Sequence, residues 1–522
     1  MPSQKVGTLF FELTSHCNMH CRFCPSDELG RAKGHLDDEM ARRFLEAAPE
    51  FGGQILFNVV GEPLLNNKLF EYIAIAEAHN IPVFIVTNMT LLTEERMRRL
   101  CSFSNVSLGL SVQTSTTDSF KTRGYNRISS FEEYMEIACQ ALEAKFKYRS
   151  RMHIDVYLAS ELPQDAVDSD FGRLWTLYSG QAEFAAGEKY CVERLTRLSE
   201  ELKQKYPEMY EEELQRVLVQ LEGQVVNGQL VREWRKLPPP GPNSDFYRWM
   251  CIPGVFVSYK AFTLWARQDR FLRKHILPHQ VLYTEERSGD FPCPGTGNFG
   301  VLSNGEYTLC CRDTDGEMGI GNIREMTPQE AMASPRRAEL MANAAACQLC
   351  RRCLGKTFLL DSSPLAANVQ PIDKLGGGYY PQGTDLLAGR TGRWTKGTAH
   401  AYFCSRLQTS RLSLDIYSPH AEGTRCGVLL SRWDDGSGSF VTDTYHEFTA
   451  TTGCYSRLSL AVQLQLGRFY RLTLVSPTVE ISGQWLGLGV AALRVEGRPV
   501  EGVELNSAHP EQHQFVQIEH RP

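Results

Sequence analysis

The 522-residue sequence lacks any long run of lysine or arginine and any apolar run long enough to cross a bilayer. Its formal net charge is -6, so neither a nucleic-acid groove nor a membrane-surface patch is indicated. The apolar stretch near the N-terminus is too short for a secretory signal and is interrupted by Glu12. These absences predict a soluble, cytoplasmic protein without nucleic-acid or membrane partners.

No internal repeat is evident, and the chain is longer than a single hydrophobic core usually supports, so we expect two or more domains. Residues 1–189 alternate apolar segments with amphipathic ones. Five strands are expected at 8–13, 52–60, 81–88, 105–112 and 152–160, and a further short strand within 171–190. This rhythm predicts parallel strands joined by crossover helices, in a sheet covered on both faces.

The composition and the predicted secondary structure of the remaining chain change at several points. Residues 190–289 are charged and helical in pattern apart from the proline run at 237–242, which predicts a helical insertion that is either a lid or a packing buttress. Residues 290–356 carry a group of cysteines, and 357–398 are rich in glycine and proline, as in a linker. Residues 399–522 contain many short alternating strands, which predict a β-sandwich or jelly roll.

Sixteen cysteines are many for an intracellular protein unless some bind metal or do chemistry. The first group has the spacing Cys-x3-Cys-x2-Cys, at Cys17, Cys21 and Cys24, directly after the first expected strand. Three thiolates on one loop suit a 4Fe-4S cluster in which the fourth iron has no protein ligand. The alternative is a zinc site completed by neighbouring histidines, namely His16, His20 and His35.

This cysteine loop, with Phe23 directly before Cys24, resembles the signature of the radical S-adenosylmethionine (SAM) superfamily. Further resemblances follow in order at successive strand ends. Gly61-Glu62-Pro63 resembles the family's GGEP motif, although Val60 replaces the first glycine. VTNMTLLT resembles TNGTLL, and SVQTSTTDSFKTRG follows the fourth strand. Each motif alone is a common turn, so it is their order that carries the resemblance.

The resemblance implies an α/β fold, a partial (β/α)6 TIM-like barrel whose strand ends share one ligand-binding face. It implies that SAM binds the open iron and that a flavodoxin- or ferredoxin-type reductant starts its cleavage to a 5'-deoxyadenosyl radical. By resemblance Glu62 and backbone carbonyls receive the SAM amino group, Ser111 and Gln113 approach its ribose, and Arg123 its carboxylate. The implied cofactor-binding residues are Phe23, Gly61, Glu62, Pro63, Asn88, Ser111, Gln113 and Arg123.

The second cysteine group resembles the SPASM or Twitch extension of that superfamily. Cys293 is followed by eleven residues, Gly305, four residues and Cys310, and a hairpin with Asn304-Gly305 at its turn is expected to bring the two cysteines together. The further cysteines of a full SPASM pattern are missing, which predicts one auxiliary 4Fe-4S cluster; a four-thiolate zinc ribbon is the alternative. Two of Cys347, Cys350 and Cys353 would complete the ligands, with Cys350 and Cys353 preferred and Cys311 a packed neighbour.

These features predict a radical SAM oxidoreductase or isomerase that oxidises or epimerises its substrate, with the auxiliary cluster as electron relay. A carbohydrate-linked substrate is preferred because Trp433 and Trp485 of the expected sandwich could stack on sugars; maturation of a ribosomally made peptide or protein is the alternative. A zinc-stabilised protein that binds a glycan or a partner is the alternative of another class. No catalytic residue is assigned, but four scattered thiols are candidate hydrogen donors: Cys101, Cys139, Cys191 and Cys251.

Overall fold

A computed structural model describes most of the chain. The described residues are 5–21, 24–114, 116–121, 123–125, 127–159, 181–221, 225–226, 229–230, 248–260, 279–372, 374–380, 383–386, 390–407, 409–481 and 483–499. The chain divides into two compact units, one formed by residues 1–271 and 288–354 and the other by residues 272–287 and 355–522. None of the helices within the described ranges is long and apolar enough to cross a membrane.

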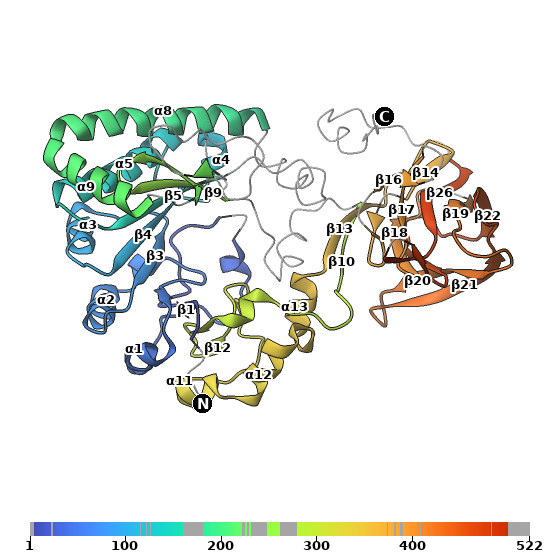
Figure 1. Cartoon of the computed structure of the whole chain (residues 1–522), viewed down its shortest axis with the longest axis horizontal. Helices are drawn as coiled ribbons and strands as arrows, with labels where there is room; N and C mark the ends of the chain where they lie inside the picture. Colours follow the sequence, from blue (N-terminus) through green and yellow to red (C-terminus); the bar gives the residue numbers. More distant parts are fainter. Residues whose placement is uncertain are drawn as a thin grey trace. The chain divides into compact units, whose positions relative to one another are not determined.

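The first unit is built on a parallel sheet of the kind found in a partial barrel (Figure 1). Six strands run parallel in this order: β1 (Thr8–Phe11), β2 (Gln54–Leu56), β3 (Val83–Thr87), β4 (Val106–Ser111), β5 (His153–Ala159) and β9 (Val255–Lys260). Strand β11 (Phe299–Val301) adds to the other side of β1, also in parallel. Antiparallel strands end the sheet at both edges, β12 (Tyr307–Thr308) and β8 (Arg248–Ile252).

The sixth parallel strand is not where the sequence predicted it. It is β9, whose sequence VFVSYK is rich in β-branched and aromatic residues, whereas residues 181–190 begin helix α8 (Gln181–Lys205). The prediction failed because the run QAEFAAGEK consists mainly of good helix formers. The expected helical insertion is therefore helical only in α8 and α9 (Pro207–Leu221), before the short pair β6 (Val225–Val226) and β7 (Gln229–Leu230). The second expected helical stretch, 259–277, begins with the last two residues of β9 and otherwise lies outside the described residues, as do the proline run and residues 171–180 of the expected short strand.

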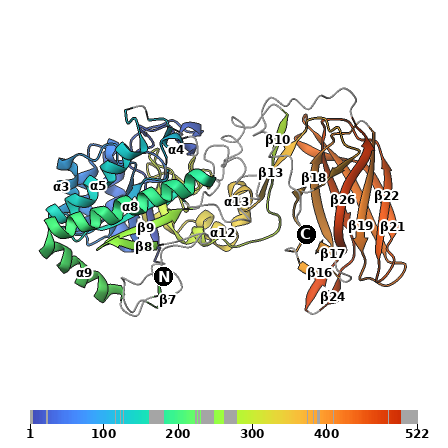
Figure 2. The ribbon, with the colours of Figure 1, turned by 90° about the horizontal axis from the view of Figure 1, so that it is seen from above.

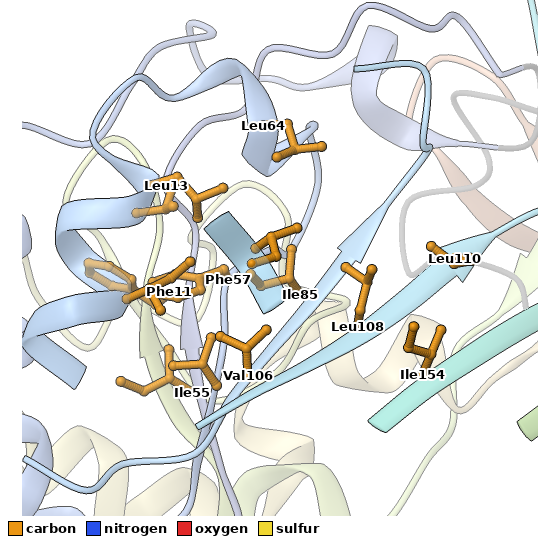
Figure 3. Packing of buried hydrophobic residues seen from close by; sticks show 14 of the residues in the cluster. Phe11, Leu13, Ile55, Phe57, Leu64, Ile85, Val106, Leu108, Leu110 and Ile154 are labelled. Carbon is orange, nitrogen blue, oxygen red and sulfur yellow. The ribbon is translucent and has the colours of Figure 1, made fainter. Parts of the chain in front are cut away.

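Helices connect the strands and cover the sheet, and three of them have a side-chain N-cap. They are α1 (Asp38–Phe51), α2 (Leu69–Ala78), α3 (Glu94–Cys101), the short α4 (Thr117–Lys121) and α5 (Phe131–Lys147). The side chains of Asp37, Thr93 and Ser130 each accept a hydrogen bond from a backbone N–H in the first turn of the helix that follows. Alternate strand side chains, among them Phe11 and Ile85, pack with apolar residues of these helices into one core (Figure 3).

After β9 the first unit continues with the second cysteine group. The predicted hairpin forms between β11 and β12, and Gly305 at its turn has φ +90°. Short helices follow: α11 (Pro328–Met332), α12 (Pro335–Ala342) and α13 (Gln348–Cys353). Single-turn 3-10 helices lie at Pro25–Glu28, Pro63–Leu65, Pro294–Gly297 and Ala344–Ala346.

The second unit is all-β, as the alternating pattern predicted, and its two sheets enclose a common core (Figure 2). One sheet is ordered β16-β17-β26-β19-β22, with β14 also paired to β26, and the other is ordered β15-β18-β23-β20-β21. The long strands are β18 (Thr398–Cys404), β19 (Thr409–Tyr417), β20 (Arg425–Asp434), β21 (Ser439–Thr449), β22 (Tyr455–Val462), β23 (Phe469–Val475) and β26 (Gly489–Arg498). A hairpin of β24 (Val479–Ile481) and β25 (Gln484–Leu486) and the antiparallel pair β10 (Gln280–Glu285) and β13 (Lys356–Asp361) complete the unit.

The segment 357–398, expected to be a linker, is instead part of this unit. Besides β13 it contributes β14 (Val369–Pro371), β15 (Lys374–Leu375), β16 (Gly383–Leu386) and β17 (Arg390–Trp394). Its glycines serve tight packing: at Gly378, which has φ +86°, a Cβ would lie 1.9 Å from the Thr398 carbonyl oxygen. Glycine and proline therefore mark close turns here and not a flexible chain.

Candidate functional site

The first three cysteines lie on the loop that follows β1. Cys24 donates its backbone N–H to the carbonyl oxygen of Cys21 at 2.9 Å, and the thiol of Cys24 interacts electrostatically with those of Cys21 and Cys17. Burial is the main cause that raises the pKa of Cys17 to about 11, and it also raises the pKa of Cys24. Isolated thiolates are disfavoured in such a place, whereas iron ligation deprotonates thiols outright, so the three side chains fit a cluster.

Asn88 brings the end of β3 to this loop, as the resemblance implied. Its Nδ2 donates to Cys17 Sγ at 3.6 Å and to Asn18 Oδ1 at 2.9 Å, while its Oδ1 accepts from the backbone N–H of Thr90 at 3.1 Å. The backbone N–H of Met19 also donates to Cys17 Sγ, at 3.4 Å. Hydrogen bonds to a ligand sulfur orient it and tune the metal centre, so Asn88 supports the first cluster.

Gly61 lies where only glycine fits. It has φ +83°, and a Cβ there would lie 2.2 Å from the Thr14 carbonyl oxygen. The next residue, Glu62, donates its backbone N–H to the carbonyl oxygen of His16 at 2.9 Å. The exit of β2 therefore packs directly against the cysteine loop, and Pro63 begins the 3-10 turn that leads away from it.

The carboxylate of Glu62 is buried and hydrogen-bonded to the ends of neighbouring strands. It is 1% exposed and accepts hydrogen bonds from the backbone N–H of Leu64 at 3.2 Å, from Thr87 Oγ1 at 2.8 Å and from the backbone N–H of Asn88 at 2.7 Å. Burial raises the pKa of this carboxyl. Its bonds tie the exits of β2 and β3 together.

Arg123 is likewise occupied by the chain itself. It is 2% exposed; its Nη1 donates to the carbonyl oxygens of Ser111 and Val112, each at 2.6 Å, and its Nη2 donates to Met19 Sδ at 3.5 Å. It therefore holds the end of β4 against the cysteine loop. Gln113 has φ +51°, unusual for a residue other than glycine, and donates its backbone N–H to the Tyr157 carbonyl oxygen. Phe23 lies outside the described residues.

Asn58 is a residue that the sequence analysis missed. It follows β2 on the way to Gly61, and its Oδ1 is buried without a hydrogen-bond partner among the described residues. An unpaired buried acceptor is costly, so it marks a place where a donor is missing. The signal in the sequence was a polar side chain within the apolar run ILFNVV.

The histidines near the first group pair elsewhere. The ring centroids of His16 and His35 are 5.1 Å apart, and His20 Nδ1 lies 3.0 Å from Asp27 Oδ2. Within the described ranges, no three His, Cys, Asp or Glu side chains are placed to hold one metal ion. A 4Fe-4S cube takes each thiolate on a separate iron, and its ligands need not converge on one point.

Two cysteines of the second group lie beside Gly295, and two others interact with them. A Cβ at Gly295 would lie 3.5 Å from Cys293 Sγ and 3.6 Å from Cys310 Sγ, so the predicted hairpin does bring these two sulfurs together. The thiols of Cys350 and Cys353 each interact electrostatically with those of Cys293 and Cys310. Two further cysteines lie beside this set. The thiol of Cys347 forms a hydrogen bond with that of Cys350, and Cys311 packs against Phe10, Val59 and Leu302.

Arg312 was not singled out from the sequence, although it directly follows the cysteine pair Cys310-Cys311. Its Nη1 donates to Cys353 Sγ at 3.1 Å, and its backbone N–H donates to Cys310 Sγ at 3.4 Å. Burial acts against the charge of Arg312, but the neighbouring thiol groups outweigh it and raise its pKa. A permanent cation therefore contacts the second group.

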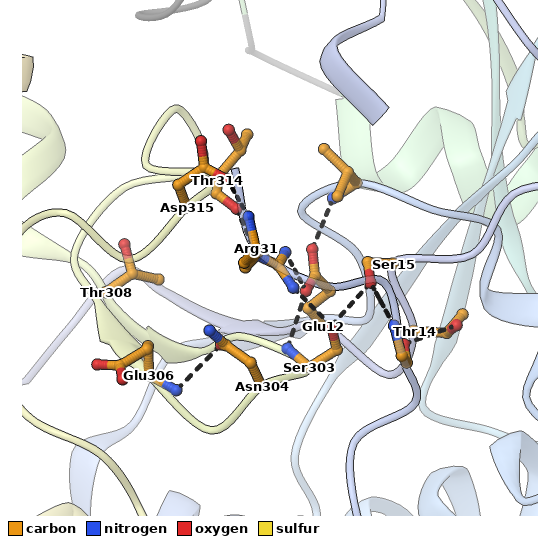
Figure 4. Close-up of polar contacts among 12 residues, drawn as sticks. Glu12, Thr14, Ser15, Arg31, Ser303, Asn304, Glu306, Thr308, Thr314 and Asp315 are labelled. Carbon is orange, nitrogen blue, oxygen red and sulfur yellow. Dashed lines mark hydrogen bonds and ion pairs between the residues drawn. The ribbon is translucent and has the colours of Figure 1, made fainter. Parts of the chain in front are cut away.

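A buried polar network joins the segments that carry the two groups (Figure 4). Glu12, at the end of β1, accepts from Arg31 Nη2 at 2.6 Å and from the backbone N–H groups of Val60 and Ser303 at 3.2 and 2.8 Å. Arg31 also donates to the Thr314 carbonyl oxygen at 2.6 Å and to Ser303 Oγ at 2.7 Å. The network fixes the first cysteine loop and the second hairpin to the same strand end.

Three of the four candidate hydrogen donors lie in helices and are buried between the sheet and its covering helices. Cys101, Cys139 and Cys191 are 8%, 2% and 0% exposed and belong to the main core. Burial raises the pKa of Cys101 to about 11 and that of Cys139 to about 12. They behave as inert packed thiols and are not placed at the strand ends. Cys251 lies in β8.

Two other features lie apart from these residues. A hollow of about 640 Å³ borders α9 and contains none of the predicted site residues; its lining includes Arg151, Met209 and Arg216. In the all-β unit, Trp433 is half-buried and packs against Tyr283 and Phe440, with ring centroids 5.8 and 5.1 Å apart. Trp485 is 58% exposed.

Comparison with known proteins identifies both cysteine regions. Residues 11–159 match the model of the radical SAM superfamily, and residues 293–354 match the SPASM model of an iron-sulfur cluster-binding domain. The chain therefore contains a radical SAM domain followed by a SPASM domain. Members of this superfamily are enzymes that use SAM and iron-sulfur clusters, so the cofactors predicted from the cysteine spacing are confirmed.

The curated relatives resemble only part of the chain. The tungsten-containing aldehyde ferredoxin oxidoreductase cofactor-modifying protein of Pyrococcus furiosus is 29% identical over 94 residues, which are 18% of this chain and 26% of the relative. The S-adenosylmethionine-dependent nucleotide dehydratase of Flammeovirga pacifica is 28% identical over 170 residues, 31% of this chain and 58% of the relative. The PqqA peptide cyclase of Granulibacter bethesdensis is 34% identical over 106 residues, 20% and 28% of the two chains. The chain thus spans less than two thirds of each of these relatives.

Solved structures resemble parts of the chain at low similarity. The structure of BtrN in complex with AdoMet and 2-DOIA covers 66% of this chain and 92% of its own, with 14% identity and a TM-score of 0.30. The CBM36-1 domain of a multidomain xylanase from the hindgut metagenome of Trinervitermes trinervoides covers 25% of this chain and 98% of its own, with 14% identity and a TM-score of 0.18. At these scores neither structure decides a substrate or a ligand.

Proposed function

We propose that this radical SAM enzyme abstracts a hydrogen atom from a C–H bond of a carbohydrate-linked or other small substrate and oxidises it, with one auxiliary 4Fe-4S cluster as the electron relay. The observation that carries the proposal is the convergence of the second group of thiols beside Gly295. A cluster with four thiolates has no open iron for SAM, so electron transfer is the chemistry left to it.

The residues present fit both clusters. We assign the first to Cys17, Cys21 and Cys24, and the auxiliary cluster to Cys293, Cys310, Cys350 and Cys353. The last two are chosen over Cys347 because each interacts with both Cys293 and Cys310. When bound, the first cluster and SAM supply the electron and the 5'-deoxyadenosyl radical, which is the cofactors' own chemistry.

The chain's part in this chemistry is placement. Asn88 orients Cys17, while Glu62 and Arg123 fix the exits of β2, β3 and β4 around the first loop. Asn58 Oδ1 offers a buried acceptor at the same edge, and we assign it to the SAM amino group in place of Glu62. Such preorganised groups hold the reacting atoms in register without reorganisation during the reaction.

Oxidation is favoured over epimerisation by the positions of the thiols. An epimerase returns a hydrogen atom to the substrate from a donor that faces it. Of the candidate donors, Cys101, Cys139 and Cys191 are packed in the core among the described residues. An oxidase instead needs an acceptor for the second electron, and the SPASM domain supplies one.

A peptide or protein substrate is the second candidate, because one relative is a PqqA peptide cyclase. The substrate class is tested by incubating the reduced enzyme with SAM in D2O, with a panel of amino sugars and glycosides in one series and peptides in another. Loss of two hydrogens from a sugar supports the proposal, and modification of peptides alone overturns its substrate class. Deuterium incorporation without net oxidation overturns the reaction in favour of epimerisation.

Two matched variants separate the clusters. Combined replacement of Cys17, Cys21 and Cys24 by alanine must abolish formation of 5'-deoxyadenosine. Cys353→Ala must leave SAM cleavage in place and stop substrate oxidation. If anaerobically purified protein is colourless and contains zinc, the third reading, a zinc-stabilised binding protein, replaces the proposal.

A further inference from the structure

Arg312 brings a fixed positive charge to two sulfurs of the second cysteine group. Its guanidinium donates to Cys353 Sγ at 3.1 Å, and its backbone N–H donates to Cys310 Sγ at 3.4 Å. The side chain is half-buried, and within the described part of the chain it forms no ion pair with a carboxylate. Its charge is therefore available to the sulfurs.

The other charged side chains near the second cysteine group do not form an ion pair with Arg312 among the described residues. The adjacent carboxylate, Asp313, is fully buried and accepts hydrogen bonds from the backbone N–H of Glu317 at 2.7 Å and from Thr308 Oγ1 at 3.1 Å. Both Asp313 and Arg336 interact electrostatically with Cys347, the thiol outside the proposed ligand set. Of these three charged side chains, Arg312 is the one that is hydrogen-bonded to a proposed ligand.

A cation in this position has a definite effect on a cluster. Reduction adds one negative charge, which is spread over the iron atoms and the sulfurs. Hydrogen bonds to the ligand sulfurs and nearby positive charge stabilise the more negative state and so raise the reduction potential. The effect is stronger where water is partly excluded, as it is around the half-buried Arg312.

We propose that Arg312 raises the reduction potential of the auxiliary cluster and thereby makes it an effective electron acceptor. Its role in turnover rests on the proposed function: the substrate radical loses one electron and one proton, the cluster gains the electron, and water takes the proton. The potential itself is a property of the protein that needs neither SAM nor substrate. Failure of this proposal and failure of the proposed function are therefore distinguishable.

The test measures the midpoint potential of the auxiliary cluster alone. The full chain with Cys17, Cys21 and Cys24 replaced by alanine is reconstituted with iron and sulfide, so that the auxiliary signal stands free of the first cluster. It is titrated with dithionite and followed by electron paramagnetic resonance. Arg312→Gln and Arg312→Met remove the charge, Arg312→Lys retains it, and Arg324→Gln changes an exposed arginine that bonds to Asn304 in the same hairpin.

We expect Arg312→Gln and Arg312→Met to lower the reduced-to-oxidised ratio at a given potential about tenfold, which is about 59 mV for a one-electron couple. Arg312→Lys should shift it less, and Arg324→Gln should leave it unchanged. A neutral variant with full iron content and an unaltered midpoint overturns the proposal. Loss of the cluster from both neutral variants but not from Arg312→Lys also overturns it, because Arg312 would then serve assembly and not the potential.

Discussion

Arg31 Nη2 lies 2.6 Å from Glu12 Oε2, and the two side chains are 7% and 0% exposed. The pair joins the loop that follows the first cysteines to the end of β1. Through Ser303 and Thr314 it also reaches the segment that holds the second group. Two cysteine groups that are far apart in the sequence are thus fixed to one strand end by a buried pair of opposite charges.

Replacement of one partner of this pair should destabilise the first unit strongly. Arg31→Met leaves the carboxylate of Glu12 buried without its cation, and breaking a buried pair in this way costs about 3–5 kcal/mol. The exposed pair Arg98 and Glu95 provides the control, because Arg98→Met should cost less than about 1 kcal/mol. Denaturant unfolding of the full chain measures both. Equal effects of the two substitutions would contradict a buried role for Arg31.

The sequence predicts those parts of the fold whose signals lie within the segment itself, and it misses the parts that depend on distant segments. Strands β1 to β5 are specified by their own apolar residues, and the cysteine spacings are local too, so both could be predicted. Strand β9 was missed because its partner β5 lies almost a hundred residues away and the intervening sequence is strongly helical. The misassigned linker shows the same limit, since pairing of β14 and β17 with β26 depends on strands much later in the chain.

The two cysteine-bearing domains could be recognised from the sequence, but the hydrogen bonds around the cysteines could not. Motif resemblance implied that Glu62 and Arg123 lie near SAM. The hydrogen bonds that such side chains form also depend on carbonyl and N–H groups from other strands, which the motifs do not reveal. Here the backbone N–H of Asn88 donates to the Glu62 carboxylate, and the carbonyl oxygen of Ser111 accepts from the Arg123 guanidinium. Arg312 and Asn58 were missed for the same reason, because their contacts form only in the folded chain.

Asn58 should matter for SAM and not for the fold. If its Oδ1 accepts the SAM amino group, Asn58→Ala removes one hydrogen bond to a charged donor, and we expect SAM to bind about tenfold more weakly, equivalent to about 1.4 kcal/mol. The control is Asn105→Ala, since Asn105 Oδ1 is also buried without a partner among the described residues but lies before β4, at the opposite end of the strands. Equilibrium binding of SAM to the reconstituted enzyme measures both. Equal loss of affinity in the two variants would remove Asn58 from the SAM site.

The all-β unit should lose stability in mild acid. Burial, aided by the nearby charge of Arg471, lowers the pKa of His400 from its usual 6.5 to about 4. In the unfolded chain the His400 ring is protonated below about pH 6.5, whereas in the folded chain it is protonated only below about pH 4. Between these pH values the unfolded chain binds more protons, so acid favours unfolding. Allowing for the partial exposure of the ring, we expect a loss of about 1–2 kcal/mol between pH 7 and pH 4.5. Calorimetry of the full chain at both pH values, with His400→Asn as the variant that loses this part of the dependence, measures it. An identical pH dependence in the variant would contradict the assignment.

Gly61→Ala should disable the first cluster through one steric contact. Alanine at φ +83° pays the usual cost of a left-handed conformation, and its Cβ would in addition lie 2.2 Å from the Thr14 carbonyl oxygen on the cysteine loop. Gly289→Ala separates the two costs, because Gly289 has φ +75° but nothing lies within 4 Å of the added Cβ. We expect Gly289→Ala to cost about 1 kcal/mol and to keep full activity. In Gly61→Ala the loop must shift, and we expect SAM cleavage to fall at least tenfold together with iron bound at the first site. Iron content and 5'-deoxyadenosine formation are measured for both variants in parallel. If the two variants behave alike, the left-handed backbone conformation alone requires glycine at position 61. The packing of the β2 exit against the cysteine loop would then not be the reason.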